Sequence, residues 1–523
     1  MKTRQKHLSQ FFDGAAVLAI ATVVTKVLGL LYKAPLSRIL GDEGMGYFNS
    51  AYTVYTFFYI LCSAGVPKAV SILISENDAK NGRGGERRII KRALIFFSLL
   101  GILLTLLFMA FSDAICRLIN NSGAYYTMLV IAPSVLFVSV SGVTKGHLSG
   151  NSRLLPLAVS QLIEGGAKFF LGIAFALLGY WRGMEIRVLC AFTILGITVG
   201  SIISAIYLLI CSRLLVSKEK NIPKRSSQNS VKRIIKIAIP LTLGAAVMSI
   251  SNMIDLTTVM RGLKSLGYSE AGASALYGNY TTLAVPMFNL VVSLITPFFI
   301  ASLPLLSRSY TRGDILDFEN QVSFCMKKAF FISVPSSVAF IFYSKEILSL
   351  IFDSTSSEIG APLLSILAPS LIFLTGQTMV NTALEASGHY KAPIITMLIG
   401  VIPKISASYF LIGNSSVGIL GAPIGTVLCY ATGFVSSLII LQVKSEVHVH
   451  VIKEIWKPLT AAFCALFINE FVGNIINFPE KGIVFSLVCI IFFGMLYLLF
   501  YVILLKFTET EPIFLSICTK NGH

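Results

Sequence analysis

Long apolar segments separated by short polar ones recur along the whole chain. About 20 mainly apolar residues allow an α-helix to cross a bilayer, and fourteen segments meet that requirement. Membrane-spanning helices are predicted near 12–34, 45–74, 90–112, 126–147, 154–179, 186–213, 235–261, 274–305, 322–343, 361–387, 391–413, 419–443, 456–476 and 482–506. Ten-residue alternating segments, typical of outer-membrane barrels, do not dominate the pattern. The predicted fold is therefore an all-α, polytopic membrane protein.

The apolar pattern also contains an internal repeat. The Ala-Pro-Ser motif at 132–134 recurs at 368–370, and the similarity continues as far as Lys168 and Lys404, again 236 positions apart. Solenoid units are much shorter, roughly 20 to 50 residues. Two large apolar copies instead indicate a transporter whose substrate path follows the interface between the repeats.

The longest polar segment, 214–234, separates the two copies. Each copy supplies six predicted spans, and an even number makes the copies parallel repeats that both start on the same side of the membrane. We predict an N-terminal lobe at 1–213, a cytoplasmic linker at 214–234 and a C-terminal lobe at 235–443. The remaining segment, 444–523, adds two spans that match neither copy.

Composition excludes a soluble globular protein. Hydrophobic residues make up 55% of the chain and charged residues 13%, whereas soluble domains carry about 25% charged residues. The net charge of +17 also suits nucleic-acid binding, but most of the 42 Lys and Arg residues lie in segments that would face one side of the membrane. This asymmetry predicts cytoplasmic N- and C-termini. We expect membrane lipids, and no nucleic acid, to be the partners of the basic segments.

Motifs for cofactor or metal chemistry do not occur. The chain has no GxxxxGK[ST], no GxGxxG after a strand and no HExxH. His448 and His450 share a loop but lack the further ligands of a zinc site, and nine cysteines are scattered singly. We therefore expect no cofactor, no metal, no catalytic residues and no enzyme. An ion gradient, the membrane potential or the substrate's own gradient would supply the energy.

Four lysines inside predicted spans are candidates for substrate binding. A basic side chain at the middle of a span costs at least ~2.5 to 3.5 kcal/mol, so it normally faces a hydrated cavity or a partner. Lys26 lies about fourteen residues, roughly 21 Å, into the first span. Lys168 and Lys404 have corresponding depths, so two-fold symmetry would place them on opposite walls of one cavity suited to an anion. Lys68 lies near the cytoplasmic end of its span, where snorkelling to the interface is an equal alternative.

Two acidic residues within spans extend this set. Glu164 precedes Lys168 by four residues, the spacing at which a carboxylate and an ammonium meet on one helical face. The two residues either form a neutralised structural pair or have a substrate-facing or coupling role. Asp255 either binds a coupling cation, lines the site or pairs with Lys26.

A further charged group lies at the external end of the first span. Arg38 is a candidate for guarding an exit, and solvation at the surface is the alternative. Lys33, Asp42 and Glu43 are expected to be solvated surface residues.

Three segments carry a resemblance to a known family. They read Gly-Asp-Glu-Gly-Met-Gly-Tyr-Phe at 41–48, Ala-Gly-Val-Pro-Lys-Ala-Val-Ser at 64–71 and Ser-Gln-Leu-Ile-Glu at 160–164. These segments resemble the polysaccharide-transporter branch of the multidrug and oligosaccharidyl-lipid exporter superfamily. Within that branch the chain is similar to the group of stage V sporulation protein B and the MurJ-type lipid II flippases, over roughly residues 8–506.

The resemblance implies fourteen helices in two six-helix lobes plus a final pair, which open alternately inward and outward around a cationic lumen. It implies a flippase of the bacterial cytoplasmic membrane with an undecaprenyl-diphosphate-linked glycan as cargo, a lipid II-like cell-wall precursor. MurJ-type proteins typically carry arginine in the first-span motif, where this chain has Lys26, and a further basic position reads Tyr32, with Lys33 beside it. Lysine keeps the charge but loses the two-pronged contact of arginine with phosphate, which leaves the glycan open.

Three other functions are compatible with parts of the pattern. A flippase for capsule or teichuronic-type lipid-linked oligosaccharides would need the same lumen. A multidrug antiporter of the same superfamily would need an acidic lumen, for which Glu164, Asp255 and Glu385 are the candidates. A membrane glycosyltransferase would need acidic or histidine residues on sizeable external loops, and the predicted loops are short.

Overall fold

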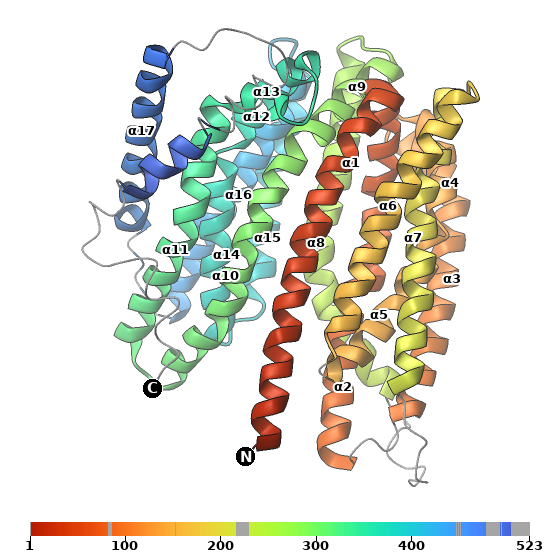
Figure 1. Cartoon of the computed structure of the whole chain (residues 1–523), viewed down its shortest axis with the longest axis vertical. Helices are drawn as coiled ribbons and strands as arrows, with labels where there is room; N and C mark the ends of the chain where they lie inside the picture. Colours follow the sequence, from red (N-terminus) through yellow and green to blue (C-terminus); the bar gives the residue numbers. More distant parts are fainter. Residues whose placement is uncertain are drawn as a thin grey trace. The chain divides into compact units, whose positions relative to one another are not determined.

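The computed structural model describes residues 2–81, 86–151, 153–215, 230–445 and 451–476, positions 447, 449 and 492, and residues 494–503. Over these residues all regular secondary structure is helical, which confirms the all-α prediction (Figure 1). The predicted linker 214–234 lies largely outside the described residues, as do His448, His450 and much of the predicted last span.

The chain forms two compact units. The first comprises Met1–Thr282 with Ser408–Ile419, and the second comprises Leu283–Ala407 with Leu420–His523. The main helices of the first unit are α1 (Lys2–Ser63), α2 (Val66–Asn81), α3 (Glu86–Leu118), α4 (Tyr125–Ile131), α5 (Ser134–Gly150), α6 (Leu155–Trp181), α7 (Ile186–Leu215), α8 (Ser230–Ser265) and α9 (Glu270–Asn279).

A π-helical turn, Tyr280–Ala284, follows α9. The helices of the second unit are α10 (Val285–Thr311), α11 (Ile315–Phe342), α12 (Ser344–Ser349), α13 (Ser354–Leu367), α14 (Ser370–Ala386), most of α15 (Ala392–Ile412), α16 (Gly421–Ser445) and α17 (Val451–Ile476). The lobe boundaries drawn from the repeat remain a prediction about symmetry.

The chain is a multi-pass membrane protein. Among the described helices, ten are long and apolar enough to cross a membrane, or up to twelve when each of two bent pairs counts as one span. The predicted number of fourteen is not established. The apolar segment Ile20–Ser75 counts as one of the ten, although it contains two of the predicted spans. In addition, only Gly494–Ile503 of the last predicted span forms a described helix.

The repeated Ala-Pro-Ser motif marks an equivalent bend in each copy. Helices α4 and α5 meet at 42° around Pro133, and α13 and α14 meet at 40° around Pro369. The carbonyl before each proline accepts a hydrogen bond from a hydroxyl of a neighbouring helix: Thr105 Oγ1 of α3 at 3.4 Å from Ala132, and Ser337 Oγ of α11 at 2.9 Å from Ala368. The spans at equivalent positions in the two copies therefore have similar bends.

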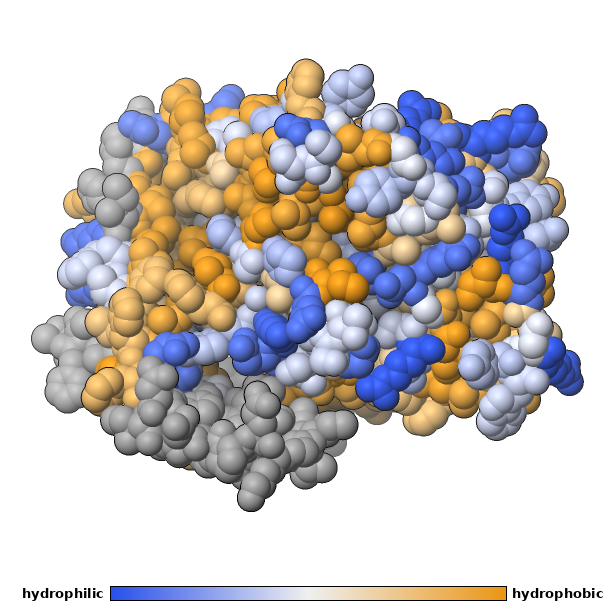
Figure 2. Space-filling view, turned by 90° about the horizontal axis from the view of Figure 1, so that it is seen from above, coloured by the Kyte–Doolittle hydropathy of each residue, from blue (hydrophilic) through white to orange (hydrophobic). Residues whose placement is uncertain are grey.

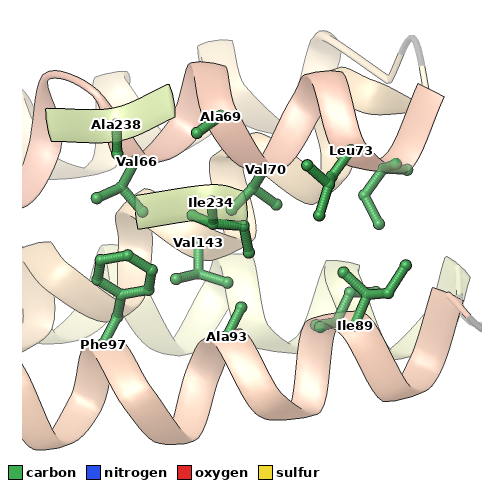
Figure 3. Packing of buried hydrophobic residues seen from close by; sticks show 12 residues of the cluster. Val66, Ala69, Val70, Leu73, Ile89, Ala93, Phe97, Val143, Ile234 and Ala238 are labelled. Atoms are coloured by element: carbon green, nitrogen blue, oxygen red, sulfur yellow. The ribbon is translucent and has the colours of Figure 1, made fainter. Parts of the chain in front are cut away.

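The first unit has an apolar core between α2, α3, α5 and α8. Figure 3 shows Ile234 and Ala238 of α8 close to Val66 and Val70 of α2, with Phe97 of α3 nearby. Each of these side chains is buried. Because these side chains are close-packed against one another, they fix the positions of the four helices.

Other apolar side chains remain at the surface. Exposed residues of α3 include Leu99, Leu103, Leu106 and Phe111, and Figure 2 shows hydrophobic residues reaching the surface in an end-on view. Such large exposed apolar patches are rare on soluble monomers. They are the surface that a membrane-embedded helix presents to lipid.

The C-terminal helical segments of the second unit pack against α11. Phe463 of α17 contacts Phe342 with ring centroids 6.1 Å apart. From the segment Gly494–Ile503, the Tyr501 hydroxyl donates to the carbonyl of Phe331 at 3.1 Å. Phe331 lies four residues before Pro335, which has no N–H to donate to that carbonyl. Tyr501 therefore satisfies the backbone acceptor that the proline leaves open.

Candidate functional site

The first helix turns back on itself and so brings its two halves together. Gly41 has φ 64° and ψ 179° within α1, a left-handed conformation that glycine adopts without steric cost. In a straight helix, residues 33 and 49 would be about 24 Å apart, but Lys33 Nζ lies 3.5 Å from Asn49 Oδ1. Residues after Gly41 therefore run back alongside those before it (Figure 1).

Helix α6 is held close to α7 by small residues. On α7, Gly196 and Gly200 form a GxxxG pair, an arrangement that lets membrane helices approach closely. A methyl group at Gly196 would lie 2.6 Å from Cα of Gly172, and one at Gly200 would lie 3.2 Å from the carbonyl oxygen of Glu164. This close packing fixes the stretch of α6 that carries Lys168.

Lys33 is anchored between two parts of the first unit. Its Nζ donates to the backbone carbonyl of Thr281 at 2.5 Å, in the π-helical turn, and to Asn49 Oδ1 at 3.5 Å. Asn49 in turn donates from Nδ2 to Thr282 Oγ1 at 2.8 Å. The ammonium of Lys33 is therefore inside the helix assembly and not in the solvated position that we predicted for it.

Lys168 contacts two aromatic rings of α1. Its Nζ lies 4.6 Å from the ring centroid of Tyr52 and 5.6 Å from that of Tyr32. Both distances fall within the range of cation–π attraction, which stabilises an ammonium without neutralising it. Tyr32 is buried, and its hydroxyl packs against Gly172 of α6.

The two ammonium groups interact electrostatically with each other. Across the residues that the structure describes, neither Lys33 nor Lys168 has a carboxylate within ion-pairing distance. Their partners are carbonyl oxygens and aromatic faces, none of which carries a compensating negative charge. We call Lys33, Lys168, Tyr32, Tyr52 and Asn49 the paired-lysine site. Its chemistry suits a ligand with several negative charges.

The remaining basic candidates lie in different surroundings. Lys26 is exposed and precedes Lys33 by seven residues, which is about two helical turns and places both on one face of α1. Lys68 of α2 and Arg38 of α1 are also exposed. Lys404 lies in the second unit and is 3% exposed. Its predicted position opposite Lys168 remains a prediction.

The acidic candidates are also placed by the structure. Glu164 pairs with Lys145 of α5, its Oε2 lying 3.9 Å from Nζ. The predicted neutralised pair between Glu164 and Lys168 does not form. Asp255 is buried in α8 and interacts electrostatically with Tyr277, so cation binding by Asp255 stays a prediction.

The interior position of Lys33 and the contacts of Tyr32 and Tyr52 with Lys168 were not predicted from the sequence. One signal was available, because Lys33 shares a helical face with Lys26 at a spacing of seven residues. The contact with Thr281 was not predictable, since it joins residues 248 positions apart.

Two family models match the chain. The model described as "Polysaccharide biosynthesis protein" matches residues 11–310, and the MatE model matches residues 240–410. Together they cover the paired-lysine site and most of both units.

Known proteins with similar sequences include two from Bacillus subtilis (strain 168). Stage V sporulation protein B is 22% identical over 422 residues, covering 80% of this chain and 80% of its own length. Lipid II flippase MurJ is 23% identical over 450 residues, covering 82% and 81%. A solved structure of lipid II flippase MurJ in an inward closed conformation has a similar fold, with a TM-score of 0.71 at 18% identity over 94% of this chain and 98% of that chain.

Proposed function

We propose that this chain, which belongs to the polysaccharide biosynthesis protein family, is a flippase for an undecaprenyl-diphosphate-linked cell-wall precursor. It would carry the headgroup from the inner to the outer leaflet by alternating access, with both termini in the cytoplasm. The observation that supports this cargo is the paired-lysine site, where Lys33 and Lys168 lack acidic partners among the described residues. A lipid diphosphate supplies the missing negative charge.

The chemistry of the lipid fits the composition of the protein. A diphosphate must leave water to cross the membrane, and ammonium groups in a low-dielectric interior compensate for that loss. The polyprenyl chain needs no such compensation and remains among apolar side chains or lipid. Only the headgroup has to pass through the polar interior.

Lys26 extends the basic surface toward the cytoplasmic end of α1. It lies on the same helical face as Lys33 and is exposed, so it is positioned to attract the headgroup first. Lys404 of the second unit stays a candidate for substrate binding, and we assign Lys68 and Arg38 to the two ends of the path. Glu164 and Asp255 remain candidates for substrate contact and for a coupling cation, respectively.

Other members of the substrate class fit the same site. A lipid-linked oligosaccharide for capsule or a teichuronic-type polymer has the same diphosphate, so the paired-lysine site does not distinguish it. Export of cationic drugs is disfavoured, because Lys33 and Lys168 would repel a cation. No catalytic step is part of the proposal.

Transport by the purified protein in proteoliposomes tests the proposal. The substrate is a lipid II analogue with a fluorescent headgroup, and an impermeant quencher reports the rate at which the headgroup changes leaflet. We expect Lys33→Met and Lys168→Met each to slow translocation at least tenfold. Lys345→Met is the matched control, because Lys345 is an exposed lysine of the second unit that pairs with Glu358. Wild-type rates in both site variants would refute the proposal.

A further inference from the structure

A ladder of tyrosines continues from the paired-lysine site along α1. The ring centroids of Tyr52 and Tyr55 are 5.9 Å apart, and those of Tyr55 and Tyr59 are also 5.9 Å apart. Spacings of three and four residues place all three on one face of the helix. Tyr55 is buried, while Tyr52 and Tyr59 are half-buried.

Helix α6 runs beside this ladder with two charged residues. Lys168 covers the ring of Tyr52, and Glu164, one turn or about 6 Å earlier on α6, interacts electrostatically with Tyr55 and Tyr59. The ladder therefore leads from the ammonium of Lys168 to the carboxylate of Glu164.

Lys145 completes the far end of the ladder. Its Nζ lies 3.9 Å from Glu164 Oε2, with side chains 20% and 29% exposed. That distance is too long for a direct hydrogen bond. Within the described residues, neither side chain has another hydrogen-bond partner. The half-buried carboxylate and ammonium thus retain their capacity to accept and donate.

We propose that Tyr52, Tyr59, Glu164 and Lys145 form a saccharide subsite for the first sugar linked to the diphosphate, with the buried Tyr55 ring packed between the other two tyrosines. This inference rests on the proposed function and adds that the protein recognises the sugar as well as the diphosphate. A pyranose ring has an apolar C–H face that packs on aromatic rings. Its hydroxyl edge donates to a carboxylate and accepts from an ammonium. The subsite begins one helical turn from Lys168, where the sugar next to the phosphate would lie.

Purely apolar occupants fit this surface less well. A fatty chain or a hydrophobic drug would bury the Glu164 and Lys145 charges without offering them hydrogen bonds, which is unfavourable. A sugar satisfies both groups and covers the tyrosine rings. The combination of aromatic rings with an ion pair that lacks direct hydrogen bonds therefore favours a saccharide.

Binding to the full chain in nanodiscs tests the subsite with two probes. One is undecaprenyl diphosphate, and the other is the same lipid carrying a single N-acetylglucosamine. Wild type should bind the sugar-bearing lipid about tenfold more tightly. Glu164→Gln and Tyr59→Ala should each weaken binding of the sugar-bearing lipid about fivefold and that of undecaprenyl diphosphate less than about twofold. Tyr59→Phe keeps the ring and should retain most of the preference.

The outcomes separate this inference from the proposed function. Equal weakening of both probes by Glu164→Gln, or an equal affinity of wild type for the two lipids, would overturn the saccharide subsite. If neither lipid binds wild type, or if Lys168→Met binds both normally, the flippase proposal fails as well. Thermal unfolding of each variant verifies that an altered affinity does not come from unfolding.

Discussion

Lys33 Nζ donates to the backbone carbonyl of Thr281 at 2.5 Å, within the π-helical turn that follows α9. A π-turn shifts the backbone hydrogen-bond pattern and is frequent at functional sites. An ammonium that already binds a neutral carbonyl is available to a stronger acceptor. A phosphate oxygen, being charged, competes with Thr281 for Lys33.

Removing the ammonium of Lys33 should weaken the binding of undecaprenyl diphosphate. A hydrogen bond to a charged group contributes about 1.5–3 kcal/mol, so Lys33→Met should raise the Kd about tenfold to a hundredfold. Nanodisc binding measures this change. Lys33→Arg keeps the charge and should lose less affinity. An unchanged Kd for Lys33→Met would show that Lys33 does not contact the headgroup.

A buried polar cluster joins three helices of the first unit and should be important for stability. His147 Nε2 lies 2.7 Å from Glu86 Oε1, and His147 Nδ1 lies 2.6 Å from Ser212 Oγ. Asn151 Nδ2 also donates to Glu86 Oε1, at 2.5 Å. Glu86→Ala removes the acceptor that His147 and Asn151 share and should lower the free energy of unfolding by about 3–5 kcal/mol.

Reversible unfolding in mixed micelles measures that loss. The control is Glu185→Ala, because Glu185 forms an exposed pair with Arg187 at 3.7 Å. Exposed pairs contribute at most about 1 kcal/mol, so the control should stay near wild type. Similar stabilities of the two variants would contradict the structural role of the cluster.

The crossing of α1 and α9 should not tolerate a larger residue at Gly46. A Cβ atom there would lie 2.0 Å from the carbonyl oxygen of Ser274. Gly46→Ala must push the helices apart and should cost about 1–3 kcal/mol. Gly29→Ala is the matched control in the same helix, because nothing lies within 4 Å of its Cβ position.

The two alanine variants should therefore differ in sign. In a helix, alanine is more favourable than glycine by about 0.8–1 kcal/mol, so Gly29→Ala should be neutral or stabilising. Thermal unfolding in detergent compares the two variants. Equal melting temperatures would mean that the α1–α9 crossing is looser than the structure indicates.

The hydroxyl of Tyr501 should matter more than that of Tyr497. Tyr501→Phe removes the hydrogen-bond donor of the half-buried Phe331 carbonyl, at a cost of about 1–3 kcal/mol. Tyr497 donates to the carbonyl of Pro335 at 3.2 Å. That carbonyl can still accept the ordinary helical hydrogen bond from the N–H four residues later. Tyr497→Phe should cost about 0.5–1.5 kcal/mol. Reversible unfolding of both variants tests the order, and a larger loss for Tyr497→Phe would contradict it.

Much of the fold was predictable because membrane spans are set by local composition. The apolar segments predicted most of the helices, and the Ala-Pro-Ser repeat marked positions that are equivalent in the structure, but the bends at Pro133 and Pro369 were not predicted. The predicted spans 12–34 and 45–74 lie on either side of Gly41, where α1 turns back on itself. The total of fourteen is not established, because much of the predicted last span lies outside the described residues.

The site was less predictable, because its contacts join distant parts of the chain. The prediction that Glu164 pairs with Lys168 relied on a spacing within one helix. In the structure, Lys145 of a different helix approaches Glu164, and the rings of α1 attract Lys168. Helical spacing fixes which residues share a face, whereas packing between helices selects among their possible partners.

The contact between Tyr501 and Phe331 has a consequence for the duplicated halves of the chain. A proline inside a helix leaves one backbone carbonyl without its usual donor, and lipid chains offer no hydrogen bond in its place. In α11 the donor is Tyr501, from a segment outside the predicted repeat. The second half therefore depends on the C-terminal extension, because without Tyr501 the carbonyl of Phe331 would lack this hydrogen bond. The C-terminal extension is therefore a structural part of the second unit.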